Sequence, residues 1–262
     1  MKDDPIKDWF PAGGEPRNPM KAAQAAMRRA LPKCFYKAAG VEESGAGFQL
    51  VLDGKPARTP AKKALAVPTR ALGEALSEEW NGQGAEIDPA NMPLTRIVNS
   101  ALDGVAPRRE AVIADIAKYA GSDLVCYRAG EPERLVADQA AAWDPILAWA
   151  REALGARFVL STGVMHVEQP GAAVEAVRAR LEAIVSPFQL AALHVMTTLT
   201  GSALLALAHA AGRLDADAAW AAAHVDERYQ ESLWGEDEEA MLRREAREVE
   251  FRAASTVYAL SR

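Results

Sequence analysis

The chain has 262 residues, half of them hydrophobic, and a formal net charge of −6. This is enough apolar material to bury a core in one large or two modest domains. The negative charge disfavours binding to nucleic acid and stable association with anionic membranes, because both repel it. Alanine and leucine dominate the apolar half, and both favour helices, so a mostly helical protein is expected.

Residues 1–30 are predicted to form an extended or partly disordered arm, with a short helix over 21–30. Four prolines within the first 20 residues rule out a continuous helix. The first ten residues mix lysine with aspartate and have no apolar centre. They therefore resemble neither a secretory signal nor a mitochondrial presequence, and we expect a cytoplasmic protein.

Residues 31–86 are predicted to form a small antiparallel β-rich domain. The Asp53-Gly54 pair is a strong hairpin signal, because glycine adopts a positive φ without a Cβ clash. Pro56 suits an edge strand, since proline cannot donate to a sheet ladder. The predicted strands cover 34–37, 47–52, 55–59 and 63–67.

A helix is expected to follow this sheet from Thr69, which can cap its amino end. Its apolar positions Leu72, Leu76 and Trp80 recur at every fourth residue. The larger part of the chain, residues 87–262, is predicted to form an all-helical C-terminal domain. Together the two parts define an α+β fold.

Proline marks the expected starts of three helices in this second domain, near Pro93, near Pro107 and at Asp144-Pro145. In the last of these an N-cap residue precedes a proline at the first helical position. The segment Leu124–Tyr127 fits either a strand or a helix, and residues 158–160 fit a short extended segment. The remaining predicted helices cover about 171–184, 187–199, 202–211, 215–230 and 236–260.

Charge and hydropathy divide the chain unevenly. Residues 1–86 carry a net charge of +2, and residues 87–262 carry −8, which supports the boundary between the two domains. The most apolar window, 190–208, is long enough to span a bilayer but is interrupted by Thr200-Gly201-Ser202. Two buried helices joined at this break are expected there.

The last predicted helix, 236–260, has apolar residues at steps of three and four. This spacing predicts one stripe that faces the core along the whole helix. Its charged residues include two pairs spaced by four, Glu239–Arg243 and Glu248–Arg252, which are typical of a solvated face. The apolar positions are Leu242, Ala246, Val249, Ala253, Val257 and Leu260.

The sequence contains no recognisable catalytic or metal-binding motif. No phosphate loop or Gly-x-Ser-x-Gly elbow occurs, and no two of the four histidines lie within one helical turn. Cys34 and Cys126 form no Cys-x-x-Cys pair, which indicates a reducing compartment and small buried side chains rather than nucleophiles. His194 and His209 lie in apolar helices, where a hydrogen-bonded core or interface histidine is expected.

The segment from Trp234 to Glu239 is the most informative stretch. Gly235 can turn the chain, and Asp237, Glu238 and Glu239 then lie in the first turn of a helix, where the helix dipole stabilises negative charge. That explains the acids but not the large aromatic side chain beside them. An aromatic anchor with directional charges is typical of a protein-binding surface.

Eight stretches, in order from about residue 34 to the C-terminus, resemble the assembly chaperones that hold the alpha subunit of F1-ATPase before it joins the beta subunit. None of them alone is a chemical signature, and the match rests on their order. They are Phe35-Tyr36-Lys37, the run Leu52 to Pro60, Glu79-Trp80, Met92 to Thr95, Asn99 to Asp103, Cys126 to Ala129, Trp143 to Ile146, and Trp234-Gly235-x-x-Glu238.

The resemblance implies a molecular chaperone without catalysis, cofactor, metal or small-molecule substrate. It implies the F1 alpha subunit as partner and Glu238 as the important acid, with Trp80 as a second family landmark. Trp234, Gly235, Asp237 and Glu239 are candidate partner-binding residues beside Glu238. Mitochondrial members carry His-Asp shortly after the acid, where this chain has Met241-Leu242. With no presequence, the chain is similar to a bacterial member.

Two other classes of function remain open at this point. One is an enzyme whose site is assembled from distant segments, around Cys126 or the carboxylates. The other is an adaptor for a different protein complex.

Overall fold

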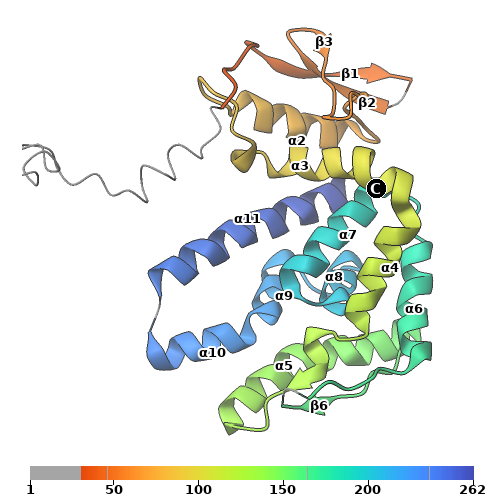
Figure 1. Ribbon diagram of the computed structural model, residues 1–262, viewed down its shortest axis with the longest axis vertical. Helices are drawn as coiled ribbons and strands as arrows, with labels where there is room; N and C mark the ends of the chain where they lie inside the picture. Colours follow the sequence, from red (N-terminus) through yellow and green to blue (C-terminus); the bar gives the residue numbers. More distant parts are fainter. Residues whose placement is uncertain (1–30, 46, 164, 236) are drawn as a thin grey trace, which may run out of the picture.

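The computed structural model describes residues 31–45, 47–163, 165–235 and 237–262. The predicted arm, including its expected helix over 21–30, lies outside these residues. A small sheet covered by one helix sits at one end of the described chain, and the remaining helices form the larger part (Figure 1).

The sheet is antiparallel and centred on strand β2 (Gly47–Leu52). β1 (Ala39–Ser44) pairs along one side of it, and β3 (Lys55–Pro56) and β4 (Ala66–Val67) pair along the other. The predicted hairpin is confirmed, with positive φ at Asp53 (49°) and Gly54 (74°).

The prediction of a strand over 34–37 is wrong. Here the Asp53 carboxylate accepts hydrogen bonds from the backbone N–H groups of Lys37 and Ala38 at 3.0–3.1 Å. The backbone of this segment therefore pairs with a side chain instead of with a neighbouring strand. The strand begins only at Ala39. The two predicted return strands are also shorter than expected, because a turn with Lys62 at φ 65° separates them.

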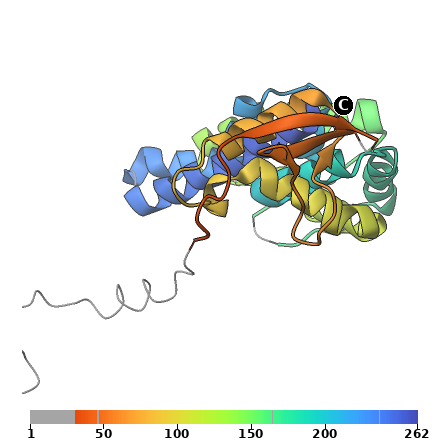
Figure 2. The ribbon, with the colours of Figure 1, turned by 90° about the horizontal axis from the view of Figure 1, so that it is seen from above.

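Helix α2 (Arg70–Asn81) covers one face of this sheet (Figures 1 and 2). As predicted, the Thr69 side chain caps it by accepting from the Leu72 N–H. Gly73 allows the close approach, because a Cβ there would lie 2.8 Å from Val41 Cγ1.

A nearly continuous helical run leads from the sheet into the larger part. It passes through η2 (Pro89–Asn91), α3 (Pro93–Ser100), the π turn η3 (Ala101–Val105), η4 (Ala106–Arg108) and α4 (Arg109–Ala120). Pro93 starts α3 as predicted, whereas Pro107 lies in the 3-10 turn just before α4.

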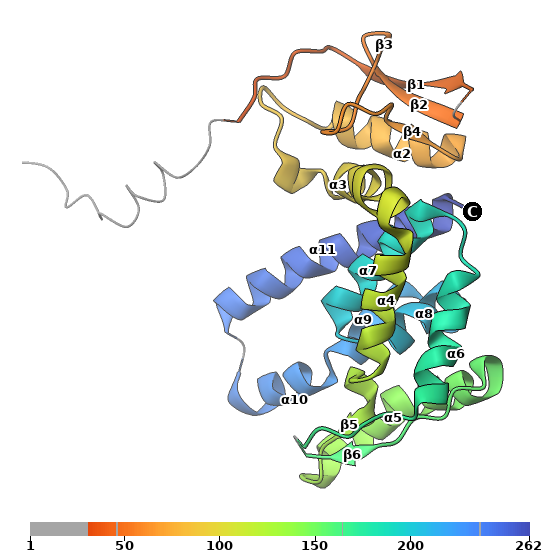
Figure 3. The ribbon, with the colours of Figure 1, turned by 45° about the vertical axis from the view of Figure 1, so that its right-hand side comes forward.

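The ambiguous segment after α4 is neither one strand nor one helix. Leu124–Cys126 forms the 3-10 turn η5, and β5 (Tyr127–Arg128) pairs in parallel with β6 (Ser161–Thr162). This two-stranded ribbon lies beside α5 at the end of the molecule opposite the sheet (Figure 3). The expected extended segment over 158–160 leads directly into β6.

The prediction that Asp144-Pro145 starts a helix is wrong. Helix α5 (Glu133–Trp149) runs through Pro145, followed by the π turn η6 (Ala150–Leu154). Trp143 and Ile146 are buried on both sides of the proline, so tertiary packing keeps the helix intact. Instead of capping, Asp144 forms an ion pair with Arg128 at 2.8 Å.

The remaining helices match the predicted positions with one exception. They are α6 (Gly171–Glu182), α7 (Pro187–Thr200), α8 (Ala203–Ala210), α9 (Ala216–Ala223), α10 (Val225–Trp234) and α11 (Glu238–Leu260). The single helix predicted over 215–230 is divided at His224 into α9 and α10.

The apolar window is two buried helices, α7 and α8, as expected. Gly201 breaks the run in the left-handed conformation, and Ser202 caps α8. Among the described residues, no helix is both long and apolar enough to cross a membrane.

One cluster of buried side chains extends from β2 and α2 through α3 and α4 into α7, α8 and α11. Polar contacts also join the two parts, for example the Arg96–Glu250 ion pair between α3 and α11. The domain boundary at residue 86 stays a prediction.

Candidate interaction surface

The turn between α10 and α11 is built as the sequence predicts. Gly235 ends α10 with φ 83° and ψ 174°, a conformation that favours glycine. Asp237 caps α11, because its Oδ1 accepts from the backbone N–H groups of Glu239 at 2.9 Å and Ala240 at 3.3 Å.

The three described acids of this turn have different surroundings. Asp237 is occupied by the cap, and Glu239 forms an ion pair with Arg243 at 2.5 Å. Glu238 is exposed and makes no side-chain hydrogen bond or ion pair with any described residue. The geometry therefore leaves Glu238 as the carboxylate that is free to contact another molecule.

Trp234 is 85% exposed at the end of α10, and its neighbour Leu233 is 53% exposed. Exposed apolar side chains that lie together, rather than singly, can mark an interaction surface. The two helices meet at this turn and extend away from the rest of the molecule (Figure 1). Exposed apolar side chains thus precede the free carboxylate by four and five residues along the chain.

The prediction of one core-facing stripe along α11 is only half right. Ala253 and Val257 are buried against the core, but Leu242 is 60% exposed and Val249 is 56% exposed. The amino half of α11 is exposed because it follows α10 away from the core. Its apolar residues Leu242 and Val249 add exposed apolar area to this helix.

A cavity of about 480 Å³ adjoins Trp234 between α5, α10 and the β5–β6 ribbon. Asp226, Tyr229 and Leu233 line it from one face of α10, at spacings of three and four. Gln139 on α5 donates to Asp226 at 2.7 Å and fixes this wall. These residues are not among the predicted site residues, although their helical spacing is a usable signal.

Trp80 lies apart from this surface, at the carboxyl end of α2. Its Nε1–H donates to Thr95 Oγ1 at 3.0 Å, and its carbonyl oxygen accepts from the Tyr36 hydroxyl at 2.7 Å. No described contact joins Trp80 to the Trp234–Glu239 segment. The structure therefore does not bring the six candidate residues into one site.

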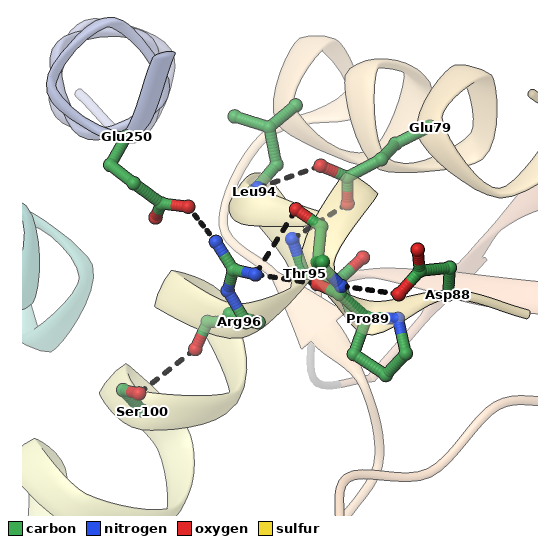
Figure 4. A network of polar contacts seen from close by, with 9 residues as sticks. Glu79, Asp88, Pro89, Leu94, Thr95, Arg96, Ser100 and Glu250 are labelled. Atoms are coloured by element: carbon green, nitrogen blue, oxygen red, sulfur yellow. Dashed lines mark hydrogen bonds and ion pairs between the residues drawn. The ribbon is translucent and has the colours of Figure 1, made fainter. Parts of the chain in front are cut away.

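The residue before Trp80 caps the next helix (Figure 4). Both Glu79 carboxylate oxygens accept from the amino end of α3, from the N–H groups of Leu94 and Thr95, at 2.8 Å each. Burial raises the pKa of Glu79, and these hydrogen bonds oppose that effect. Arg96 continues the network to Glu250 on α11, so the Glu79-Trp80 pair holds the sheet part against the helices.

Two groups with catalytic potential, Cys126 and Asp123, are inaccessible. Cys126 is fully buried, and burial raises the pKa of its thiol to about 12, so it is no nucleophile at neutral pH. Asp123 is also fully buried and accepts from Ser202 and the amino end of α8. No cluster of three metal-ligating side chains occurs among the described residues.

The histidines of the apolar helices are hydrogen-bonded, as expected. His194 Nε2 lies 2.8 Å from Asp115 Oδ2, and His209 contacts the Leu214 carbonyl oxygen and Ser255 Oγ. Each contact joins the helix to a neighbouring element.

Comparison with known proteins gives concordant results. The family model for the ATP12 chaperone protein matches residues 33–151. A proposed chaperone from Agrobacterium tumefaciens is 50% identical, with a TM-score of 0.86 over 94% of this chain and 92% of that chain. Atp12 from Paracoccus denitrificans is 41% identical, with a TM-score of 0.82 over 88% of this chain and 99% of that chain. A mutant of the Paracoccus protein is 40% identical, with a TM-score of 0.82 over 88% and 98%.

These matches place the chain in the class of assembly chaperones rather than among enzymes. The chain belongs to the ATP12 chaperone family, whose members are non-enzymatic chaperones of ATP synthase assembly. The family expected from the eight sequence stretches is confirmed.

Proposed function

We propose that this chain binds the unassembled alpha subunit of F1-ATPase in the bacterial cytoplasm and prevents its aggregation until it joins the beta subunit. The observation that carries the proposal is the free carboxylate of Glu238 beside the 85% exposed ring of Trp234. Both belong to the Trp-Gly-x-x-Glu stretch on which the family resemblance partly rests.

The chemistry of this surface suits such a client. A subunit without its partner exposes apolar surface that aggregates unless it is covered. Trp234, Leu233, Leu242 and Val249 offer apolar contact area on the chaperone. The acidic first turn of α11 adds charge that orients the encounter more than it tightens the complex. Binding of this kind covers the client and still releases it.

Family membership argues against the enzyme alternative, and the burial of Cys126 and Asp123 agrees. The adaptor alternative differs from the proposal only in the identity of the partner. The partner captured by the purified chain therefore separates these two functions.

The first test replaces the exposed anchor. Light scattering of isolated alpha subunit should fall when the wild-type chain is added. The Trp234→Ala variant should suppress this aggregation at least about ten-fold less well, because an aromatic anchor contributes about 2 kcal/mol or more to binding. Val185→Ala is the matched control, since Val185 is an 84% exposed apolar side chain on the α6–α7 connection. Equal protection by wild type and Trp234→Ala would remove the anchor from the proposal.

A further inference from the structure

A second cavity, of about 320 Å³, lies in the sheet part beside the β2–β3 turn. Phe35, Tyr36, Pro56 and Trp80 form its apolar walls, and Lys55 and Arg58 are its cations. We call it the basic–aromatic pocket. It differs in charge and in position from the surface around Trp234.

The aromatic walls are held in place by contacts within the sheet part. The Tyr36 ring packs 5.5 Å from both the Phe35 ring and the Trp80 ring. The Tyr36 hydroxyl donates to the Trp80 carbonyl oxygen, and Trp80 is fixed in turn by Thr95. Phe35 remains 72% exposed at the rim. The pocket is thus a preformed apolar seat with an unburied aromatic edge.

The charges of the pocket are unbalanced. Within the part of the chain that the structure describes, neither Lys55 nor Arg58 forms an ion pair. Asp53, which also lines the cavity, already accepts from the backbone N–H groups of Lys37 and Ala38. Arg58 donates one bond to the Lys62 carbonyl oxygen and keeps its other N–H groups. The complement is an anionic group with an apolar flank.

We propose that the basic–aromatic pocket binds a segment of the client polypeptide in which an aspartate or glutamate adjoins an apolar side chain. The inference rests on the proposed function for its client, the F1 alpha subunit. The volume of 320 Å³ is near the lower end of ligand pockets, about 300–1,000 Å³, and suits one or two side chains. Such a segment buries the exposed Phe35 ring and pairs both cations.

As a wall of this pocket, Trp80 takes part in recognition of the client although Trp80 lies away from Glu238. The chaperone then offers the client an acidic surface at the α10–α11 turn and a basic one on the sheet part. Opposite charges on two separate surfaces fix the orientation of the client, and two linked contacts bind more tightly than either alone.

The test uses the full-length chain and purified F1 alpha subunit. We expect Lys55→Gln/Arg58→Gln to weaken binding about ten-fold and to flatten its salt dependence, as loss of two steering charges does. Phe35→Ala, a substitution at a 72% exposed side chain, should weaken binding while lowering stability only slightly, through loss of the Tyr36 ring contact. The matched control is Lys118→Gln/Arg213→Gln, because these exposed cations also form no ion pair with described residues. Binding by the pocket variants within two-fold of wild type would overturn the inference and leave the proposed function standing.

A photoreactive amino acid at position 35 identifies the occupant. The cross-linked alpha-subunit peptide should contain an aspartate or glutamate beside an apolar residue. A basic peptide, residues 1–30 of this chain, or no cross-link would each overturn the inference. If the wild-type chain fails to bind the alpha subunit, the proposed function fails. The same cross-linking experiment with the other purified F1 subunits then tests the inference about the pocket separately. An acidic and apolar cross-linked peptide supports that inference, and any other result overturns it.

Discussion

At the scale of single residues, three neighbouring acids that look alike in the sequence have different roles. Asp237 caps α11, Glu239 pairs with Arg243, and Glu238 has no partner among the described residues. A helix start accounts for the first two acids. Only the third is free, so among these three acids a loss of partner binding without a loss of stability should be specific to Glu238.

Asp123 makes stability depend on pH. Burial raises its pKa from 3.8 to about 6, against the effect of its hydrogen bonds to Ser202 and the Leu204 N–H. Because the folded-state pKa exceeds the unfolded one, proton binding favours the folded state, and the contribution of Asp123 rises as pH falls from about 7 to about 4. The full shift in the pKa of Asp123 corresponds to about 3 kcal/mol in the free energy of unfolding.

The measurement is the free energy of unfolding of wild type and Asp123→Asn across this pH range. The wild type should gain stability relative to the variant as pH falls. Taking the difference removes the contributions of the other titrating groups, including His224, whose pKa burial lowers. A difference that does not change with pH would contradict the assignment.

At the scale of elements, α5 shows where sequence signals fail. Asp144-Pro145 has the form of a helix start, but Trp143 and Ile146 are buried on both sides of it and the helix continues. Burial of two large apolar side chains outweighs the hydrogen bond lost at a proline. The same effect is absent at Pro93, because only the short 3-10 turn η2 precedes the proline, and the prediction there was right.

Pro145 is exposed, so its ring contributes no core packing. Pro145→Ala should therefore raise the free energy of unfolding, by about 1–2 kcal/mol once the loss of proline's rigidity in the unfolded chain is allowed for. Urea unfolding monitored by circular dichroism checks this. Destabilisation by the substitution would contradict this expectation.

Gly73 is the corresponding test for α2. Alanine favours a helix by about 1 kcal/mol, but its Cβ would lie 2.8 Å from Val41 Cγ1, and overpacking costs about 1–3 kcal/mol. Gly73→Ala should destabilise the wild type and stabilise a Val41→Ala chain. A double-mutant cycle measures the coupling. An equal effect in both backgrounds would mean that Val41 moves aside at no cost.

At the scale of the whole molecule, much of the fold was predictable from residue spacing. The hairpin at Asp53-Gly54, the cap at Thr69 and the two buried helices around Gly201 all depend on local chemistry, and all three are confirmed. The exposed amino half of α11 was not predictable, because periodicity specifies a stripe but not the element that covers it. The same limit applies to the pocket beside Trp80.

The candidate site was predictable in part for the same reason. The Trp234–Glu239 segment is contiguous, so its residues had to lie together. The position of Trp80, in contrast, depends on contacts between residues far apart in the sequence. Trp80 donates to Thr95 on α3, and the Arg96–Glu250 pair joins α3 to α11. The molecule thus joins its sheet part to α11 through α3.

The central claim is that Glu238 contacts the client, and its most direct test is the affinity of the full-length chain for purified F1 alpha subunit. Glu238→Lys should weaken binding at least about ten-fold, because it replaces a free interfacial carboxylate with a cation. Glu245→Lys is the control, since Glu245 is also exposed on α11 without a partner among the described residues. It should bind within about two-fold of wild type. Equal affinity of Glu238→Lys and wild type for the alpha subunit would contradict the account.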